Sequence, residues 1–422
     1  MKILLALPRP LFPADTGGKI RTLNIFSRLA QSMEIHVVSL ADRKRDVDGI
    51  AQMRRIFRSY TPVFWTETPT FSARFYVQFM RARAGRFPYF LAKYRVPDLT
   101  ANIEGLLERE NFDLLLCDFL HSAVGMIGSR FRPRVLFEHN VEYLIRKRHW
   151  EQEKNPLRKA LLNGEWRKAR AVEGEVCRAF DHVISVSQQD GHLLAQEFQI
   201  RHVSILPTGV DTEYFQPQDV EPRSGSLVFV GSMDWHPNED GVMWFLEEII
   251  PLVRQRVPHV TLTVVGRNPS RRLRALAAAV SGVEVTGTVA DVRPYVAGAE
   301  VVVVPLRIGG GTRIKIFEAM AMGRAVVSTS LGAEGLPVMP GDHILLEDTA
   351  GSFASAVVSL LRNPARREQI AAAGYELTVR NQGWHVAAEI MENILLRVVG
   401  KNPNERQALE KDDTGVATKL LR

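Results

Sequence analysis

The residues best suited to chemistry lie in the segment 301–327, VVVVPLRIGGGTRIKIFEAMAMGRAVV. Its β-branched run, which ends at Pro305, predicts a buried strand. The three glycines at 309–311 predict a turn whose backbone can approach an anion closely. Thr312 is suited to cap a helix whose first amides would point at that anion. The spacing therefore predicts a phosphate-binding loop between a strand and a helix.

Charged residues follow this loop at short spacing. Arg313 and Lys315 place positive charge beside the expected anion, and Glu318 follows Thr312 by about one and a half helical turns. A carboxylate at that distance can accept hydrogen bonds from sugar hydroxyls. The alternative is a glycine-rich turn in which Glu318 only supports the helix.

A second loop of the same kind lies in residues 8–30, PRPLFPADTGGKIRTLNIFSRLA. A short apolar run leads through prolines to Gly17–Gly18, after which a helix is expected. The pattern is neither GxGxxG nor a P-loop, because no glycine-Lys-Ser/Thr sequence occurs. A glycine pair alone is a weak signal. We predict a phosphate-side or acceptor-side role for it because it follows the first strand and is expected to face the other domain.

Histidines follow three of the expected strands. His121 and His139 lie in the first half of the chain and His236 in the second. Each is placed either to act in a cleft or only to hold a turn. We expect no metal site, because the sequence has no HExxH and only two cysteines, Cys117 and Cys177.

Short β-branched runs alternate with helical patterns throughout, which is typical of parallel sheets flanked by helices. A turn-rich, proline-punctuated stretch at 207–222 separates two such regions. The sequence thus predicts an α/β protein with two facing Rossmann-like domains and a central cleft. The expected parts are domain 1–206 with a crossover helix at 384–398, linker 207–222, domain 223–380, and a disordered tail at 400–422.

The net charge of +7 is concentrated in residues 43–95, where twelve Arg or Lys face three Asp or Glu. Within them a basic amphipathic helix with aromatics is expected, which can lie on an anionic membrane or hold an anionic acceptor. A solvated basic face over an ordinary core is the alternative. We expect no nucleic-acid partner, because no recognisable binding motif accompanies the charge. The expected helix carries its apolar residues at Phe71, Phe75, Phe79 and Ala82, with Arg74 and Arg81 beside them.

Taken in order, several motifs resemble the retaining GT-B glycosyltransferases of family 4 and its group 1 relatives. They are FPADTGG, HVISVSQQD, ILPTGVDTEYF, the GTV turn at 287–289 and IKIFEAMAMGRAVVSTSLGAEGL, and the resemblance covers about residues 1–398. It implies a two-domain GT-B enzyme with a nucleotide-sugar donor bound in the second domain.

The resemblance also implies roles for particular residues. The backbone of Val289 would contact the nucleotide base, and Glu318 the ribose. Gly310, Gly311 and Thr312 would lie along the diphosphate or donor sugar, and Gly17 and Gly18 would approach the diphosphate from the first domain. The nucleotide-diphosphate sugar is a co-substrate, so no cofactor and no metal are expected.

The sequence departs from the family pattern at three places. Gly310 stands where relatives have the first of two glutamates. Gly231 is followed by Ser232 in a segment without Arg or Lys, so we expect Arg313 and Lys315 to supply the missing charge. Asp118 stands at the position of a cleft histidine, and His121 and His139 are nearby substitutes for it.

These residues predict a cytoplasmic, retaining hexosyltransferase that acts on a glycan or lipid-linked acceptor. Surface polysaccharide or glycolipid synthesis is the expected pathway, with peripheral contact between residues 71–95 and the inner face of the membrane. Two alternatives stay open: a nucleotide-sugar epimerase on the same fold, and a non-catalytic nucleotide-sugar binding protein.

Overall fold

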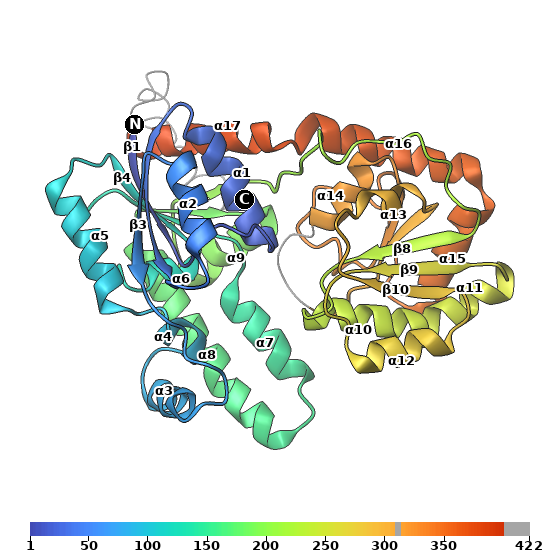
Figure 1. The fold of residues 1–422 in the computed structure, drawn as a ribbon, viewed down its shortest axis with the longest axis horizontal. Helices are drawn as coiled ribbons and strands as arrows, with labels where there is room; N and C mark the ends of the chain where they lie inside the picture. The colour runs from blue at the N-terminus through green and yellow to red at the C-terminus, as the bar shows by residue number, and fades with distance from the viewer. Residues whose placement is uncertain (309–313, 401–422) are drawn as a thin grey trace, which may run out of the picture. The chain divides into compact units, whose positions relative to one another are not determined.

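The computed structural model describes residues 1–308 and 314–400 (Figure 1). The chain divides into two compact units, Met1–Leu206 together with the chain from Ala387 onward, and Pro207–Val386. The boundary near the C-terminus falls inside helix α17, Trp384–Val398. The expected tail, Gly400 apart, lies outside the described residues.

Unit 1 is built on a parallel sheet of seven strands within the described chain, in the order β3-β2-β1-β4-β5-β6-β7. Helices cover both faces of the sheet (Figure 1). The strands are β1 Lys2–Leu7, β2 Glu34–Ala41, β3 Ser59–Phe64, β4 Leu114–Asp118, β5 Arg134–Glu138, β6 His182–Ser185 and β7 Val203–Ile205. The helices are α1 Gly17–Leu29, α2 Val47–Ile56, α3 Ala73–Ala84, α4 Tyr89–Ala92, α5 Pro97–Arg109, α6 Phe119–Ala123, α7 Glu142–Gln152, α8 Pro156–Ala179 and α9 Gln188–Phe198.

Unit 2 repeats this plan with six parallel strands among its described residues, in the order β10-β9-β8-β11-β12-β13. The strands are β8 Ser226–Val230, β9 Thr261–Val265, β10 Val283–Gly287, β11 Val301–Val304, β12 Ala325–Ser328 and β13 Leu345–Leu346. The helices are α10 His236–Trp244, the π turn η1 Phe245–Ile249, α11 Ile250–Arg256, α12 Arg271–Ala279, α13 Arg293–Ala297, α14 Ile314–Ala321, α15 Ala350–Arg362 and α16 Pro364–Asn381. The prediction of two Rossmann-like α/β domains is confirmed.

Three local predictions were wrong. Strand β3 was missed because Pro62 interrupts its pattern, which an edge strand tolerates. Helix α10 begins at His236, with Pro237 in the first turn where a missing N–H costs nothing, so His236 is not in a loop. Phe71 lies outside α3, because Ser72 caps that helix by accepting the amide of Phe75.

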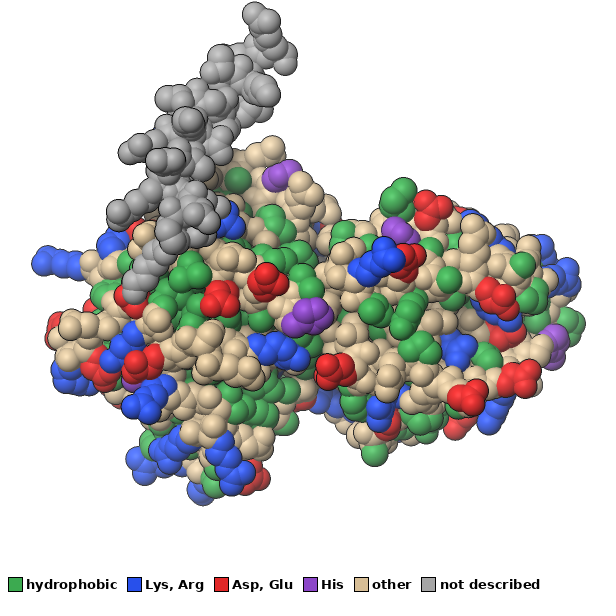
Figure 2. Space-filling model, turned by 90° about the horizontal axis from the view of Figure 1, so that it is seen from above, with side chains coloured by type: hydrophobic (Ala, Val, Ile, Leu, Met, Phe, Trp, Pro, Cys, Tyr) green, Lys and Arg blue, Asp and Glu red, His purple; other side chains and the backbone are tan. Residues whose placement is uncertain are grey.

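The described helices include none that is both long and apolar enough to span a bilayer. On the face of the molecule in Figure 2, Lys and Arg side chains are interspersed with Asp and Glu over both units. Such mixing is usual for a surface in contact with water.

The segment after Leu206 packs within unit 2 beside the start of α17. The amide of Val210 donates to the carbonyl of Gln382 at 2.6 Å. A Cβ on Gly209 would lie 2.3 Å from Cε3 of the buried Trp384 ring. Both chain connections between the units therefore leave unit 2 at one place.

We predict that Gly209→Ala lowers the free energy of unfolding by about 1–3 kcal/mol, because the added methyl forces the Trp384 ring to move. Denaturation followed by tryptophan fluorescence measures this change. Gly351→Ala is the matched control, since its Cβ would meet no atom within 4 Å in the exposed first turn of α15. Equal effects of the two substitutions would contradict the packing argument.

Candidate functional site

In unit 1 the candidate residues gather at the carboxyl ends of neighbouring strands. Strand β4 pairs with both β1 and β5, so the loops that follow these three strands meet at one edge of the sheet. Asp118 is the last residue of β4 and is completely buried. Its Oδ2 accepts a hydrogen bond from Thr22 Oγ1 at 2.8 Å, and its Oδ1 lies 2.6 Å from His139 Nε2. The structure thus brings together Asp118 and His139, which the sequence singled out separately.

The hydrogen bonds determine the tautomer of His139. Its Nδ1 lies 2.8 Å from Nη1 of Arg21, and a guanidinium can only donate. Nδ1 is therefore the acceptor, and the Nε2 proton is donated to Asp118. Burial lowers the pKa of His139, which keeps the ring neutral. Because both ring nitrogens have partners, His139 is placed to orient Asp118 and α1, not to take a proton from a substrate.

Arg21 and Thr22 belong to this site although the sequence did not predict them. Both are buried and lie in the second turn of α1, which Gly17 begins. The only available signal was their position after the glycine pair, since Arg and Thr in a helix follow no motif. Burial lowers the pKa of Arg21 to about 10, and the charge of Asp118 opposes that shift.

The two glycines of this loop have different surroundings. Gly17 is exposed at the N-terminus of α1, where amides have no partner within the helix. A Cβ on Gly18 would lie 2.3 Å from Cζ of Phe119. The Phe119 ring in turn stacks on the His139 imidazole, with centroids 3.8 Å apart and planes 10° apart. Gly18 is therefore needed for the packing that holds His139.

His121 lies apart from the hydrogen-bonded network. It is half-buried in α6 and makes edge contacts with Tyr94, at 4.9 Å between ring centroids, and with Phe90, at 5.7 Å. Burial lowers its pKa, so the ring is neutral at pH 7. Its contacts point to the segment around α4, which contains the basic residues discussed below.

Buried carboxyl groups support the loop after β5. Glu173 of α8 accepts the backbone amides of Glu142 and Tyr143 at 2.8 and 2.7 Å, and thereby holds the start of α7. Burial raises the pKa of Glu173 to about 8 and that of Glu138 well above its usual value. Both are buried, and neither was predicted. Glu173 lies on α8 and Glu138 ends β5, and an acidic residue in either place is usually exposed.

In unit 2 the candidate residues lie where β8 ends and α14 begins. Lys315 Nζ is 2.9 Å from Asn238 Oδ1 and 4.4 Å from the centroid of the Phe229 ring. A Cβ on Gly231 would lie 2.5 Å from that ammonium. Lys315 therefore places its charge at the Gly231–Ser232 turn, the place where the sequence lacks the basic residues of relatives.

Close backbone packing makes this turn narrow. A Cβ on Gly266, just after β9, would lie 1.8 Å from the carbonyl oxygen of Gly231. Asn238 of α10 is buried, and its side-chain amide donates to the carbonyl of Ser232 at 2.7 Å. This hydrogen bond attaches the turn to α10. The glycines let the strand ends and the ammonium approach one another.

Glu318 follows Lys315 by three residues and lies on the same side of α14. By exposed area its side chain is only half-buried, yet it lies deep enough that desolvation raises its pKa to about 7. The nearby Lys315 charge opposes the shift. Within the described chain the carboxylate has no hydrogen-bond partner, so it is available to a ligand.

Other predicted donor-site residues are placed only in part. Val289 is half-buried and follows the end of β10. Gly310, Gly311, Thr312 and Arg313 lie outside the described residues. The loop that leads to them is held by Arg307, which makes a two-pronged contact with Asp240 of α10 at 3.1 and 2.8 Å.

Among residues 1–308 and 314–400, no group of three or more His, Cys, Asp or Glu side chains is arranged to hold a metal ion. Both cysteines are buried and free. The acidic residues near His139 thus do not form a metal centre.

Comparison with known families gives two matches. The model for Glycosyltransferase Family 4 matches residues 16–214, and that for Glycosyl transferases group 1 matches residues 224–363. The phosphatidyl-myo-inositol mannosyltransferase of Mycobacterium tuberculosis H37Rv is 32% identical over 208 residues, 46% of this chain and 54% of that protein. An uncharacterized 44.6 kDa protein from the cps region of Klebsiella pneumoniae is 20% identical over 282 residues, 64% of this chain and 71% of that protein. The chain thus spans about half the length of the mannosyltransferase.

Solved structures with the same fold cover nearly the whole chain. Sucrose-phosphate synthase of Thermosynechococcus elongatus has a TM-score of 0.71 at 16% identity, over 95% of this chain and all of that one. The Anabaena protein HepE, in complex with UDP, has a TM-score of 0.66 at 15% identity, over 94% and 100%. The similarity shows the two-domain GT-B fold.

We predict that Asp118→Ala lowers the free energy of unfolding by about 3 kcal/mol, because it leaves Arg21 buried without its neighbouring negative charge. Asp118→Asn should cost less, since the amide oxygen can still accept the His139 proton. Urea denaturation measures both. Glu108→Ala, an exposed acid on α5, is the control and should change stability by less than about 0.5 kcal/mol.

A second prediction follows from the raised pKa of Glu318. Its pKa in the folded protein, about 7, exceeds the ordinary value of 4.5. The contribution of Glu318 to the free energy of unfolding is therefore greatest below pH 4.5 and is lost as the pH rises through 7. Glu318→Gln should therefore be more stable than the wild type at pH 8, by about 1–3 kcal/mol, and equal to it at pH 4.5. Melting temperatures across this range test it. A gain that does not depend on pH, or one also seen in the exposed Glu284→Gln, would contradict the assignment.

Proposed function

Since the chain belongs to the family 4 and group 1 glycosyltransferases, we propose that it transfers a hexose, with retention of anomeric configuration, from a nucleotide-diphosphate sugar to a glycan or lipid-linked acceptor. Unit 2 binds the donor in this proposal. The donor contacts come from Val289, Gly310, Gly311, Thr312, Arg313, Lys315 and Glu318, with Gly17 and Gly18 contributed by unit 1.

The observation that carries the proposal is the position of Lys315 at the Gly231–Ser232 turn, with Glu318 beside it on α14. The Lys315 ammonium and the half-buried Glu318 carboxylate, which has no hydrogen-bond partner among residues 1–308 and 314–400, are complementary to a nucleotide diphosphate. Lys315 forms ion pairs with the phosphates, and Glu318 accepts hydrogen bonds from the ribose hydroxyls. Ionisation of Glu318 is costly in the free protein, and ribose hydrogen bonds stabilise the charged form.

The chemistry needs stabilisation of the negative charge that develops on the departing diphosphate. In this proposal Lys315 supplies positive potential that is in place before the reaction, and Arg313 and the glycine-rich sequence at 309–311 are the further candidates for this role. With Gly310 in place of a glutamate, we see no carboxylate for a covalent intermediate, which favours front-face attack by the acceptor. The departing phosphate oxygen then takes the proton of the acceptor hydroxyl.

In unit 1, Asp118 and His139 position the acceptor-side loops. Asp118 accepts hydrogen bonds from Thr22 of α1 and from His139 after β5, so it joins these two segments. His121 lies nearer the surface of the unit and faces the aromatic residues around α4. This arrangement supports a positioning role for Asp118 and His139 and leaves His121 as the more accessible group.

The acceptor and pathway are proposed from the named relatives and the basic segment. The mycobacterial relative is named for a phospholipid acceptor, and the Klebsiella relative is encoded in a cps region. We therefore place this enzyme in surface polysaccharide or glycolipid synthesis on the inner face of the cell membrane. Residues 71–95, with several exposed Arg side chains, would make the peripheral contact with anionic lipid.

Thermal stabilisation by nucleotides tests the donor site. HepE was solved with UDP, and a Corynebacterium glutamicum relative is named as GDP-mannose-dependent, so both nucleotides and their sugars belong in the panel. We expect one nucleotide to raise the melting temperature, with no effect of EDTA. Lys315→Ala should weaken that nucleotide by at least about tenfold through the lost charge contact. Arg271→Ala, an exposed cation on α12, is the control and should bind normally.

Equal losses in Lys315→Ala and Arg271→Ala would sink the assignment of Lys315. Release of nucleotide diphosphate from the donor sugar only when acceptor is added would exclude an epimerase. Nucleotide binding without any release, over a range of acceptors, would instead support the non-catalytic alternative.

A further inference from the structure

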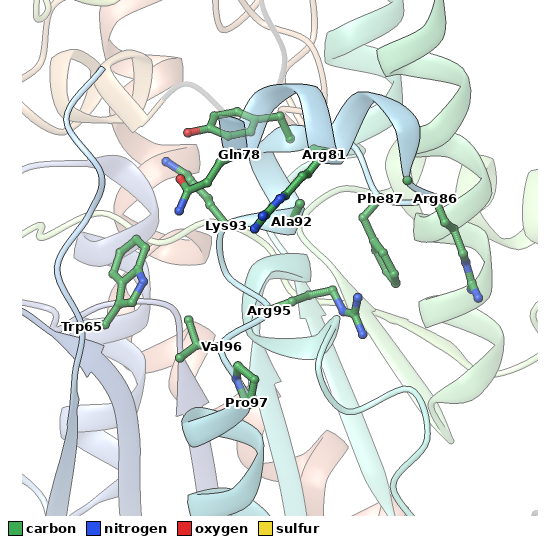
Figure 3. A pocket seen from close by; sticks show the side chains of 13 residues that line it. Trp65, Gln78, Arg81, Arg86, Phe87, Ala92, Lys93, Arg95, Val96 and Pro97 are labelled. Atoms are coloured by element: carbon green, nitrogen blue, oxygen red, sulfur yellow. The ribbon is translucent and has the colours of Figure 1, made fainter. Parts of the chain in front are cut away.

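Unit 1 contains a pocket of about 600 Å³ that has no role in the donor chemistry (Figure 3). It lies between α3, α4 and the start of α5, and Trp65 forms part of its wall. In Figure 3 the side chains of Gln78, Arg81 and Lys93 converge at one end, while Arg95 lies toward Phe87. The pocket thus combines cations with aromatic rings.

The charge of this pocket is positive and only partly compensated. Its lining contains four cations, Arg81, Arg86, Lys93 and Arg95, and no carboxylate. Two of them have acidic partners outside the lining: Lys93 Nζ lies 2.5 Å from Glu67, and Arg86 pairs with Glu175. In the described chain, Arg81 and Arg95 have no such partner. A net charge of about +2 therefore faces the pocket.

Arg95 is held in place without losing its hydrogen-bonding capacity. Its guanidinium lies over the Phe87 ring, 4.1 Å from the centroid, a contact that uses the face of the group and leaves its N–H edges free. Such a guanidinium edge binds a phosphate by paired hydrogen bonds, with a geometry that a sugar hydroxyl cannot match.

The exposed side of α3 beside the pocket is apolar. Tyr76, Val77 and Met80 are 52%, 50% and 62% exposed, on the helix whose Gln78 and Arg81 line the pocket. The opposite side of the same helix is already packed, since Phe75 and Phe79 contact Tyr89 at 5.3 and 5.8 Å between ring centroids. The helix therefore has a second apolar face next to a cationic pocket.

Aromatic contacts connect the pocket to the candidate site in the same unit. Trp65 lies beneath the guanidinium of Arg9, which belongs to the loop after β1, with 4.4 Å between them. Tyr94 contacts both Trp65, at 6.0 Å, and His121, at 4.9 Å. Trp65, in the wall of the pocket, thus lies one contact from Arg9 in the loop before α1 and two ring contacts from His121 of α6.

We propose that this pocket binds the phosphate-bearing head of an amphiphilic acceptor, while its hydrocarbon chain lies along Tyr76, Val77 and Met80. Arg81 and Arg95 offset the charge of the phosphate, and the exposed apolar face of α3 takes the chain out of water. This inference rests on the proposed function, because it specifies the acceptor of that reaction. It narrows the acceptor to a molecule with phosphate next to a long apolar chain.

Calorimetric titration with dodecyl phosphate, below its micelle concentration and in phosphate-free buffer, tests the pocket directly. The variants are Arg81→Gln with Arg95→Gln, and the matched control Arg74→Gln with Arg55→Gln, which removes the same charge from exposed positions outside the lining. We expect the pocket variant to bind at least tenfold more weakly and the control to bind as the wild type does. Met80→Ser should weaken dodecyl phosphate but leave binding of inorganic phosphate unchanged.

Three outcomes would overturn the proposal. Equal weakening in both double variants would mean a diffuse electrostatic contact, as with a membrane surface. Inorganic phosphate bound as tightly as dodecyl phosphate would mean a site for a small free anion. Undiminished binding in the pocket variant would place the amphiphile elsewhere. The same pocket variant is also tested for the nucleotide-induced rise in melting temperature. That measurement shows whether the variant is folded and whether its donor site still binds nucleotide, whatever the outcome with dodecyl phosphate.

Discussion

A carboxylate that is completely buried at the end of a strand must have its charge compensated. Asp118 is such a carboxylate, and the arrangement of the neighbouring segments in unit 1 depends on it. Thr22 and His139 bond it directly, and Arg21 completes the compensation through the imidazole. Because these partners come from α1 and from the loop after β5, the requirement ties three chain segments to one edge of the sheet. Phe119, stacked on the imidazole, fills the remaining space.

The second unit handles charge in a different way. Glycines follow two of its strands, and the positive charge is that of Lys315, which lies on α14 and not on a strand. Gly231 and Gly266 leave room for close backbone approach, and Lys315 lies over the gap that results. The Lys315 ammonium therefore lies at a narrow turn. Glu318 lies beside it, and burial makes the ionisation of its carboxyl group costly. Both features suit a ligand that carries phosphate and hydroxyls together.

The basic segment of unit 1 combines positive charge with aromatic packing. Helix α3 is anchored by its inner aromatic side, and Lys168 of α8 donates to the carbonyls of Ala82 and Arg83 at its C-terminal end. An anchored helix can present cations and apolar groups at constant spacing, which a mobile segment could not do. Four of the cations between residues 43 and 95 thereby line one pocket instead of being spread over the surface.

The sequence by itself determined the two α/β domains and most strand positions, because strand periodicity, glycine turns and helix spacing are local properties. The donor-binding role of Lys315 and Glu318 stays a prediction. Tertiary structure alone decided what those residues meet. Nothing local reveals that Lys315 lies against Gly231, that His139 bonds Asp118, or that Arg21 is buried against the other side of His139. The contacts of His139 join positions that are 21 and 118 residues apart in the sequence, through strands that are neighbours only in the sheet. Burial and the pKa shifts that follow from it depend on that packing, which no short pattern encodes.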